Sequence, residues 1–226
     1  MKRLFITSSG TGIGKTLVMR LLIEGLRAKG RTIDALKPII SGWGEEPVEE
    51  TDTGIILTAM GRPLDDTNIA DISPWRFAEA LSPDMAARRE GRAVDFDALI
   101  AFCRDRPNDA DVQLIEGVGG VLVPLDDRHT VLDWLAALEC PAVLVVGSYL
   151  GTISHTLTAA HVLRDSGVPL AAVIVSESEE EPVPSAETAA TLARFLPGVA
   201  LHVLPRPLDA ETRRTCANDF VDALAL

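Results

Sequence analysis

Residues 4–16 read LFITSSGTGIGKT, and this stretch near the start of the chain decides the fold. An apolar run at 2–7 gives way to small residues and glycines, and Gly14-Lys15-Thr16 opens a segment with apolar residues at helical spacing. Glycines let backbone N–H groups turn inward around phosphate oxygens, and the N-terminus of the following helix adds a positive dipole. The stretch therefore predicts a strand, a phosphate-binding loop and a helix.

The side chains of this loop have expected roles. Lys15 would reach the β- and γ-phosphates of a nucleotide, and the Thr16 hydroxyl would bind Mg²⁺. The usual spacing requires a glycine at position 9, where this chain has Ser9, so the loop is a variant of the common motif. The other expected nucleotide contacts in the loop and the first helical turn are Gly12, Ile13, Gly14 and Leu17.

Composition restricts the classes of protein that need considering. Of the 226 residues, 47% are hydrophobic and 24% are charged, which is typical of a soluble globular protein with a buried core. The formal net charge of −12 argues against a nucleic-acid partner, because phosphate backbones require clustered Lys and Arg. No apolar stretch is long enough to cross a bilayer, and the N-terminus runs directly into a strand, so we expect a cytoplasmic protein with no membrane partner. Three scattered cysteines, Cys103, Cys140 and Cys216, indicate reduced buried thiols.

Strand patterns alternate with helix patterns along the whole chain. Strands are expected at 2–7, 32–37, 112–115, 142–146, 170–175 and 200–204. Helices are expected from the phosphate loop to Gly30, at 51–60, 82–91, 95–106, 130–138, 153–165 and 185–196, and at the C-terminus. Residues 41–50 and 177–184 are expected to be loops, and 64–81 to be mostly loop with Trp75 and Phe77 packed inward. The alternation predicts an α/β fold, with a mainly parallel sheet flanked by helices on both faces, in a single domain over 1–226.

Polar residues that follow the strands are the candidates for chemistry, because ligands in such sheets bind beyond the carboxyl ends of the strands. Lys37 and Ser41 follow the second strand, where they could face the γ-phosphate or simply be a solvated lysine and a turn serine. Glu116 follows an apolar strand, and Asp52 starts a helix. Both carboxylates suit Mg²⁺, directly or through water, although Asp52 could instead be an N-cap residue or a first-turn acid of its helix.

Taken together, these segments resemble the dethiobiotin synthetase family, whose fold is P-loop NTPase-like. The matching segments keep the family's order over about residues 1–170, and the leading glycine of the family's loop falls at Ser8. They are residues 5–7 with 11–16, 37–42, 51–52, 77–79 with 82–83, 116–120, and 141–147 with 150–151.

The resemblance implies a ligase that uses ATP and Mg²⁺ to close a ring in biotin biosynthesis. An amine of 7,8-diaminopelargonate takes up CO₂ (from bicarbonate) to give a carbamate, which attacks the γ-phosphate to form a carbamic–phosphoric anhydride. The second amine then closes the ring and releases phosphate, and no nucleophilic side chain is required. The implied catalytic residues are Lys15, Lys37 and Thr11, with Ser41 as a further substrate contact and Thr16, Asp52 and Glu116 as metal ligands.

The nucleotide site implied by the resemblance also uses later segments. These are Glu116, Gly117, Val118 and Gly119 near the phosphates, and Ser176, Glu177, Pro205, Arg206 and Pro207 near the base. The chain departs from the family where an asparagine often reads adenine, because Ser176 lacks the paired donor and acceptor of an amide. Glycines at positions 10 and 12 replace an acidic residue that the family often carries there.

The resemblance further implies a homodimer whose substrate site lies near the interface. The substrate's tail carboxylate would bind at a helix start across that interface, through Gly151, Thr152, Ile153 and Ser154. Ser154 could instead be a plain helix cap. The four histidines, at 129, 155, 161 and 202, show no metal-ligand spacing and are expected to be structural or exposed.

Two other classes of protein remain as alternatives. An amide-forming ATPase domain of corrin-ring synthesis would require a glutaminase domain with a catalytic cysteine, for which the chain has no room. A nucleotide switch of the partition or division-site kind carries an extra lysine where this chain has Gly10. Such switches bind DNA or membranes through basic or amphipathic surfaces, which an acidic chain disfavours.

Overall fold

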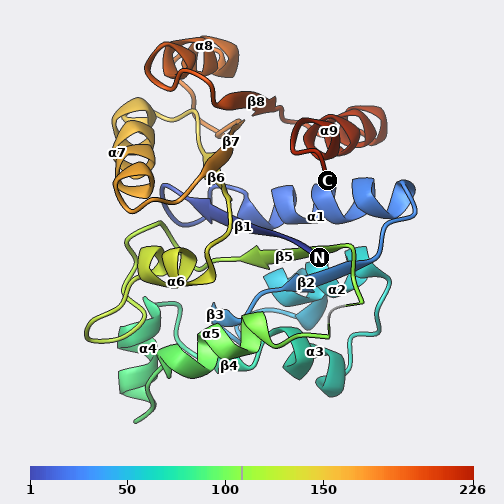
Figure 1. Ribbon diagram of the computed structural model, residues 1–226, viewed down its shortest axis with the longest axis vertical. Helices are drawn as coiled ribbons and strands as arrows, with labels where there is room; N and C mark the ends of the chain where they lie inside the picture. Colours follow the sequence, from blue (N-terminus) through green and yellow to red (C-terminus); the bar gives the residue numbers. More distant parts are fainter. Residues whose placement is uncertain (108) are drawn as a thin grey trace.

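A six-stranded parallel sheet runs through the centre of the computed structural model, which describes residues 1–107 and 109–226 (Figure 1). The strand order is β2-β5-β1-β6-β7-β8, and every pairing between these strands is parallel. The strands are β1 (Lys2–Ser8), β2 (Ile33–Leu36), β5 (Val112–Glu116), β6 (Ala142–Val146), β7 (Leu170–Ser176) and β8 (Ala200–Leu204). The expected parallel α/β fold is thereby confirmed.

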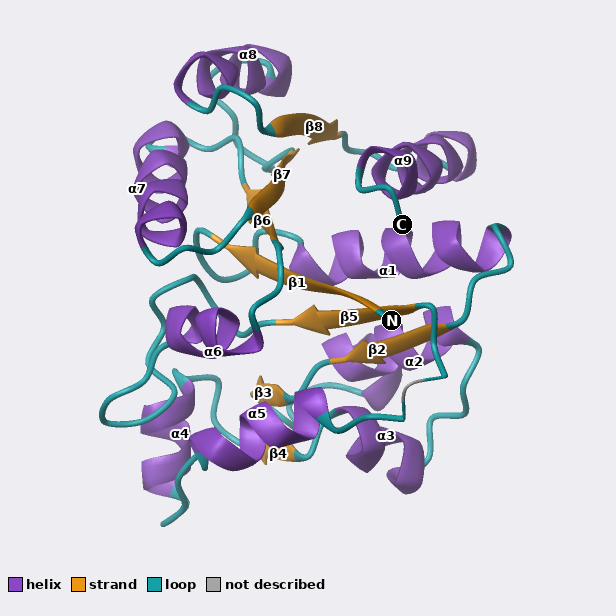
Figure 2. Ribbon diagram, viewed as in Figure 1, coloured by secondary structure: helices purple, strands orange, loops and turns teal. Residues whose placement is uncertain are grey.

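Helices cover both faces of the sheet, because its central strands are apolar on both sides. Every residue of β6 is buried, and such a strand requires a helix layer on each face. In Figure 2, α1 and α9 lie on one side of the sheet, and α6 and α7 lie on the other. The helices are α1 (Lys15–Ala28), α2 (Asp52–Met60), α3 (Asp66–Ile72), α4 (Pro83–Arg89), α5 (Phe96–Arg104), α6 (Val131–Leu138), α7 (Thr152–Asp165), α8 (Ser185–Phe195) and α9 (Ala210–Ala223).

Several helix ends follow the local signals in the sequence. Gly30 adopts a φ of +72° just past the end of α1, a conformation that glycine reaches without strain. Asp95 caps α5 by accepting a hydrogen bond of 2.9 Å from the Ala98 N–H. α6 begins with a capping box formed by Thr130 and Asp133. The differences at the other boundaries are one or two residues, as at β2 and at the end of α5.

The expectation of mostly loop over 64–81 is wrong. Asp65 caps α3 through the Asn68 N–H at 2.8 Å, and β4 (Trp75–Phe77) pairs in parallel with β3 (Ile39–Ser41) as a second, two-stranded sheet. Residues 41–50 are likewise not all loop, since Ser41 ends β3 and Val48–Glu50 form a 3₁₀ turn. Three-residue strands are too short to show a periodic pattern, and their pairing depends on contacts distant in the chain. Phe77 is nevertheless fully buried, as expected.

The core includes all three cysteines as free, buried thiols, as the sequence predicts. The Phe5 ring of β1 meets the Trp134 ring of α6 edge to face, with the centroids 4.8 Å apart. This contact fixes α6 against the central strand. Among the described helices, none is both long and apolar enough to cross a membrane.

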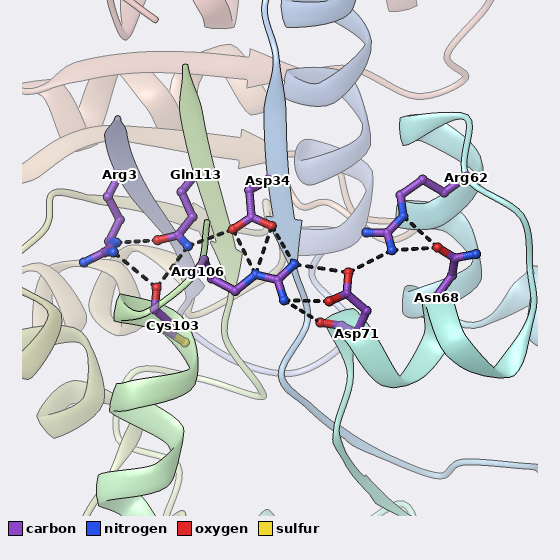
Figure 3. A network of polar contacts seen from close by, with 8 residues as sticks. All are labelled: Arg3, Asp34, Arg62, Asn68, Asp71, Cys103, Arg106 and Gln113. Atoms are coloured by element: carbon purple, nitrogen blue, oxygen red, sulfur yellow. Dashed lines mark hydrogen bonds and ion pairs between the residues drawn. The ribbon is translucent and has the colours of Figure 1, made fainter. Parts of the chain in front are cut away.

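A polar network crosses the amino ends of three neighbouring strands (Figure 3). Arg3, Gln113 and Asp34 lie side by side in β1, β5 and β2, and each hydrogen-bonds its neighbour. Arg106 joins Asp34 at 3.0 Å to Asp71 of α3 at 2.7 Å. The network therefore ties α3 and the segment after α5 to the end of the sheet opposite the phosphate loop.

Candidate active site

A cavity of about 300 Å³ lies at the carboxyl ends of β1, β2 and β5. The described residues that line it are Thr11, Gly12, Ile13, Gly14, Lys15, Thr16, Lys37, Ile40, Ser41, Asp52, Glu116, Val118, Gly119 and Arg206. All but Ile40 are residues that the sequence singles out. Ile40 belongs to β3, whose existence the sequence pattern does not reveal.

The phosphate loop leaves the start of α1 available to an anion. Gly14 is the N-cap residue of α1 and has a φ of +101°, which strains any residue with a side chain. Among residues 1–107 and 109–226, no side chain caps the first N–H groups of this helix. Unsatisfied N–H groups and the helix dipole at this position favour phosphate binding.

Lys15 reaches back across this loop. Its ammonium donates to Ser8 Oγ at 3.0 Å and to the Gly10 carbonyl at 3.4 Å. Burial, together with the nearby Lys37 charge, lowers the pKa of Lys15 to about 8. An anion placed in the loop would stabilise the charged form of Lys15. Ser8 is a contact that sequence reasoning did not assign to Lys15.

Lys37 is held by three acceptors in a buried position. Its Nζ lies 2.8 Å from Glu116 Oε1, 2.9 Å from Asp52 Oδ2 and 3.0 Å from the carbonyl oxygen of Gly117. Burial opposes the charge on Lys37, but the Glu116 and Asp52 carboxylates outweigh it and raise the pKa of this lysine. The interpretation of Lys37 as a solvated lysine is therefore wrong.

Thr16, Asp52 and Glu116 converge on one point beside Lys37. Thr16 Oγ1 lies 2.5 Å from Asp52 Oδ1 and 2.9 Å from Glu116 Oε1. Thr51, and not Asp52, caps α2 and accepts from the Gly54 N–H at 3.1 Å. Asp52 is the acidic residue in the first turn of α2, as its alternative interpretation expected.

This donor set fits Mg²⁺. Glu116 Oε2 is buried and has no hydrogen-bond partner among the described residues. Burial raises the pKa of Glu116 against the opposing influence of Lys37, whereas at Asp52 the effects of Lys37 and Thr16 outweigh burial and lower the pKa. Mg²⁺ is commonly held by one or two carboxylates together with phosphate oxygens and water, and a hydroxyl and two carboxylates meet that requirement.

Several predicted site residues lie outside the cavity lining. Ser176 is buried behind the loop, where a Cβ built on Gly14 would come within 3.0 Å of its Oγ, and that hydroxyl has no partner in the described structure. The other residues outside the lining are Leu17, Gly117, Glu177, Pro205, Pro207, Gly151, Thr152, Ile153 and Ser154.

Residues 177–184 form a largely exposed loop, as expected, and side-chain contacts connect its acidic residues to neighbouring segments. Glu177 accepts hydrogen bonds from the Ser185 hydroxyl at 2.8 Å and from the Arg206 N–H at 2.5 Å. Glu181 accepts from Ser148 Oγ at 2.7 Å. Glu177 thereby connects the loop after β7 to Arg206, which lines the cavity.

The start of α7 lies apart from this cavity. Gly151, with a φ of +98°, is the N-cap residue, so the alternative role of Ser154 as the cap is wrong. Thr152 is buried and its hydroxyl donates to the Gly147 carbonyl at 2.7 Å. Ser154 is exposed.

Three of the four histidines pair with groups close to them in the chain, whereas the buried Nε2 of His202 has no hydrogen-bond partner among the described residues. His129 lies 2.8 Å from Asp126, His161 lies 3.1 Å from Asp165, and Tyr149 lies 2.9 Å from His155. Over residues 1–107 and 109–226, no group of three or more His, Cys, Asp or Glu side chains is arranged to hold a metal ion.

Comparison with known proteins first places the chain in a broad class. The profile of a family described as AAA domain matches residues 2–211. The septum site-determining protein MinD from Pyrococcus horikoshii, solved with Mg-ADP, superposes with a TM-score of 0.55 at 15% identity over 99% of this chain and 94% of its own. Cobyrinic acid a,c-diamide synthase from Mycobacterium smegmatis, solved with ADP and magnesium, gives a TM-score of 0.56 at 14% identity over 100% and 94% of the two chains. The chain has the fold of the P-loop NTPases.

Sequence identity identifies the family within that class. An ATP-dependent dethiobiotin synthetase from Acidiphilium cryptum is 49% identical over 198 residues, covering 87% of this chain and 89% of that protein. The Methylobacterium nodulans synthetase is 44% identical over 86% and 89% of the two chains, and an Escherichia coli synthetase is 31% identical over 90% of each. The chain belongs to the ATP-dependent dethiobiotin synthetase family, which confirms the resemblance found in the sequence.

Proposed function

We propose that this protein synthesises dethiobiotin from 7,8-diaminopelargonate, CO₂ and ATP, as an ATP-dependent ligase of biotin biosynthesis. The observation that carries the proposal is the convergence of Lys15, Lys37, Asp52 and Glu116 at the mouth of a phosphate loop, in a chain 49% identical to a dethiobiotin synthetase. We treat residues 1–226 as one catalytic domain. The division-site switch and the corrin-synthesis domain share only the fold with this chain, at 15% and 14% identity.

The reaction consists of three bond-forming steps. One amine of the substrate adds to CO₂ and loses a proton, giving a carbamate. A carbamate oxygen attacks the γ-phosphorus of ATP, the bond to ADP breaks, and a carbamic–phosphoric anhydride forms. The second amine attacks the carbonyl carbon of this anhydride and loses a proton, so that the ring closes and phosphate leaves.

The protein's contribution to these steps is to position anions and to neutralise their charge. Lys15 lies beneath the phosphate loop, and Lys37 approaches the cavity from β2 on the other side. Fixed cations on two sides stabilise the charge that develops on the transferring phosphoryl group. Thr11 and Ser41, which line the cavity, would hydrogen-bond the diamine or its carbamate.

Mg²⁺ belongs to the proposed site, with Thr16, Asp52 and Glu116 as the residues that would hold it. When bound, it supplies positive charge to the phosphate oxygens. We further propose that Ser176, Glu177 and the 205–207 segment flank the base, and that Gly151–Ser154 binds the substrate's tail carboxylate in a homodimer. The proposed location is the cytoplasm.

The coupling of phosphate release to the diamine tests this function. Purified protein with ATP, Mg²⁺ and bicarbonate should release phosphate only when 7,8-diaminopelargonate is added, and mass spectrometry should detect dethiobiotin in equal amount. Diamine-independent phosphate release that DNA or lipid vesicles stimulate would refute the proposal in favour of a nucleotide switch.

Asp52→Asn should raise the Mg²⁺ concentration needed for half-maximal turnover by about tenfold, because a charged metal ligand is lost while the helix cap on Thr51 remains. A Mg²⁺ titration of turnover at saturating ATP measures this concentration. Asp84→Asn is a matched control, since Asp84 also lies in the first turn of a helix but outside the cavity. An unchanged titration for Asp52→Asn would remove this residue from the metal site.

A further inference from the structure

The Lys37 ammonium donates hydrogen bonds to Glu116 Oε1 and to the Gly117 carbonyl, and it forms an ion pair with Asp52. A lysine ammonium has three N–H donors. In this structure three acceptors surround it within 3.0 Å, namely Glu116 Oε1, Asp52 Oδ2 and the Gly117 carbonyl. Only 3% of the Lys37 side chain is exposed. Because the ammonium is buried and paired with both carboxylates, contact with a triphosphate or a carbamate requires Lys37 to move away from at least one of them.

The acceptors that hold Lys37 are the carboxylates proposed to bind the metal. Thr16 Oγ1 lies 2.5 Å from one oxygen of Asp52 and 2.9 Å from one oxygen of Glu116, yet a hydroxyl has only one hydrogen to donate. When both carboxylates are ionised, one of these two oxygen–oxygen contacts has no hydrogen between the atoms. Together with the unpartnered Glu116 Oε2, this leaves an oxygen cluster whose negative charge is balanced by Lys37.

We propose that, when no metal is bound, the Lys37 ammonium takes the place of the metal cation beside Asp52 and Glu116. A divalent ion that binds these carboxylates displaces the ammonium into the cavity. The inference rests on the proposed function, in which these carboxylates bind Mg²⁺ and Lys37 acts on the substrate. Two cations competing for the same oxygens at about 3 Å repel each other strongly in a buried site. Lysine has a flexible stem, and the cavity of about 300 Å³ that Lys37 lines gives its ammonium a place to go. Metal loading thus makes this lysine available, and a molecule without metal keeps it withdrawn.

Direct metal binding to the nucleotide-free protein tests the displacement. Mn²⁺, followed by electron paramagnetic resonance, is the probe. Lys37→Gln should bind Mn²⁺ at least about tenfold more tightly than the unmodified protein, because the metal no longer has to displace an ammonium. Lys37→Arg, which keeps the cation, should bind no more tightly than the unmodified protein.

Lys15→Gln is the matched control. It removes the same charge from the same cavity, but Lys15 contacts Ser8 and Gly10 and neither carboxylate. Its gain in Mn²⁺ affinity should stay below about threefold, because only the longer-range repulsion between the Lys15 charge and the metal ion is removed. Equal gains for Lys37→Gln and Lys15→Gln would overturn the proposal. The double variant Lys37→Gln with Asp52→Asn should lose the gain, and retention of the gain would place the Mn²⁺ elsewhere and also overturn it.

A measurement on the unmodified protein covers the case in which Lys37→Gln does not fold. Trace acetylation read by mass spectrometry should label Lys37 several-fold more when Mg²⁺ is added. Lys29, an outer lysine that pairs with Asp222, should be labelled equally with and without the metal. Unchanged labelling of Lys37 at saturating Mg²⁺ would overturn the displacement. The coupled phosphate assay separates this outcome from a failure of the proposed function, because dethiobiotin formation by the unmodified protein does not depend on where Lys37 rests before the metal binds.

Discussion

Lys37→Gln is expected to lower the turnover of 7,8-diaminopelargonate at least about a hundredfold, which is the usual cost of losing one preorganised charge contact to a transition state. The reason lies in the position of this lysine just after β2, where it lines the same cavity as the phosphate loop. Lys15→Gln should cause a loss of the same order, because Lys15 also places a positive charge in the lining of the cavity. Dethiobiotin formation at saturating ATP, diamine and Mg²⁺ measures both losses.

Lys29→Gln provides the control for this prediction. Lys29 pairs with Asp222 far from the cavity lining, so its loss should leave turnover within about twofold, as for a substitution outside the site. Saturating Mg²⁺ matters for Lys37→Gln, since this variant should bind the metal more tightly and any loss of turnover then reflects the reaction itself. Near-normal turnover in Lys37→Gln would remove Lys37 from the mechanism, and near-normal turnover in Lys15→Gln would remove Lys15.

Sequence reasoning located the cavity because its residues follow directly from the ends of strands. The loop at 9–14, Lys37 and Glu116 each come immediately after an apolar run, and parallel strands bring their carboxyl ends to one edge of a sheet. Local signals of this kind depend only on neighbours in the chain. They also placed Gly30 and Asp95 at the helix ends where the structure has them.

The contacts that the sequence did not reveal depend on residues distant in the chain. The ion pairs from Lys37 to Asp52 and to Glu116 join β2 to α2 and to β5, and no spacing in the chain predicts them. The β3–β4 pairing and Ile40 in the cavity lining were missed for the same reason. A lysine followed by a turn can be solvated or buried, and only the two carboxylates brought in by tertiary packing decide between these outcomes.

The Arg106 network also consists of contacts between residues distant in the chain. Disrupting this network is expected to have the largest effect on stability. Arg106→Met should lower the free energy of unfolding by about 3 kcal/mol, because breaking a buried ion pair leaves a charge without its partner. The side chains of Arg106 and Asp34 are only 14% and 12% exposed. Asp71 keeps its contact with Arg62 at 2.8 Å, so the loss falls mainly on Asp34, which retains the Gln113 amide as its remaining partner.

Urea unfolding of Arg106→Met and Arg88→Met, followed by circular dichroism, compares the stability lost with a buried ion pair and the stability lost with an exposed one. Arg88 also pairs with an aspartate, Asp127, at 2.8 Å, but these side chains are 68% and 86% exposed, so its loss should cost no more than about 0.5 kcal/mol.

Because the network lies at the opposite end of the strands from the cavity, turnover of folded Arg106→Met should stay within about twofold of normal, as for a substitution outside the site. Equal destabilisation by the two substitutions would show that Arg106 contributes no more than a surface ion pair. A large loss of turnover in the folded variant would instead mean that α3 and β2 transmit the position of Arg106 to Lys37 at the other end of its strand.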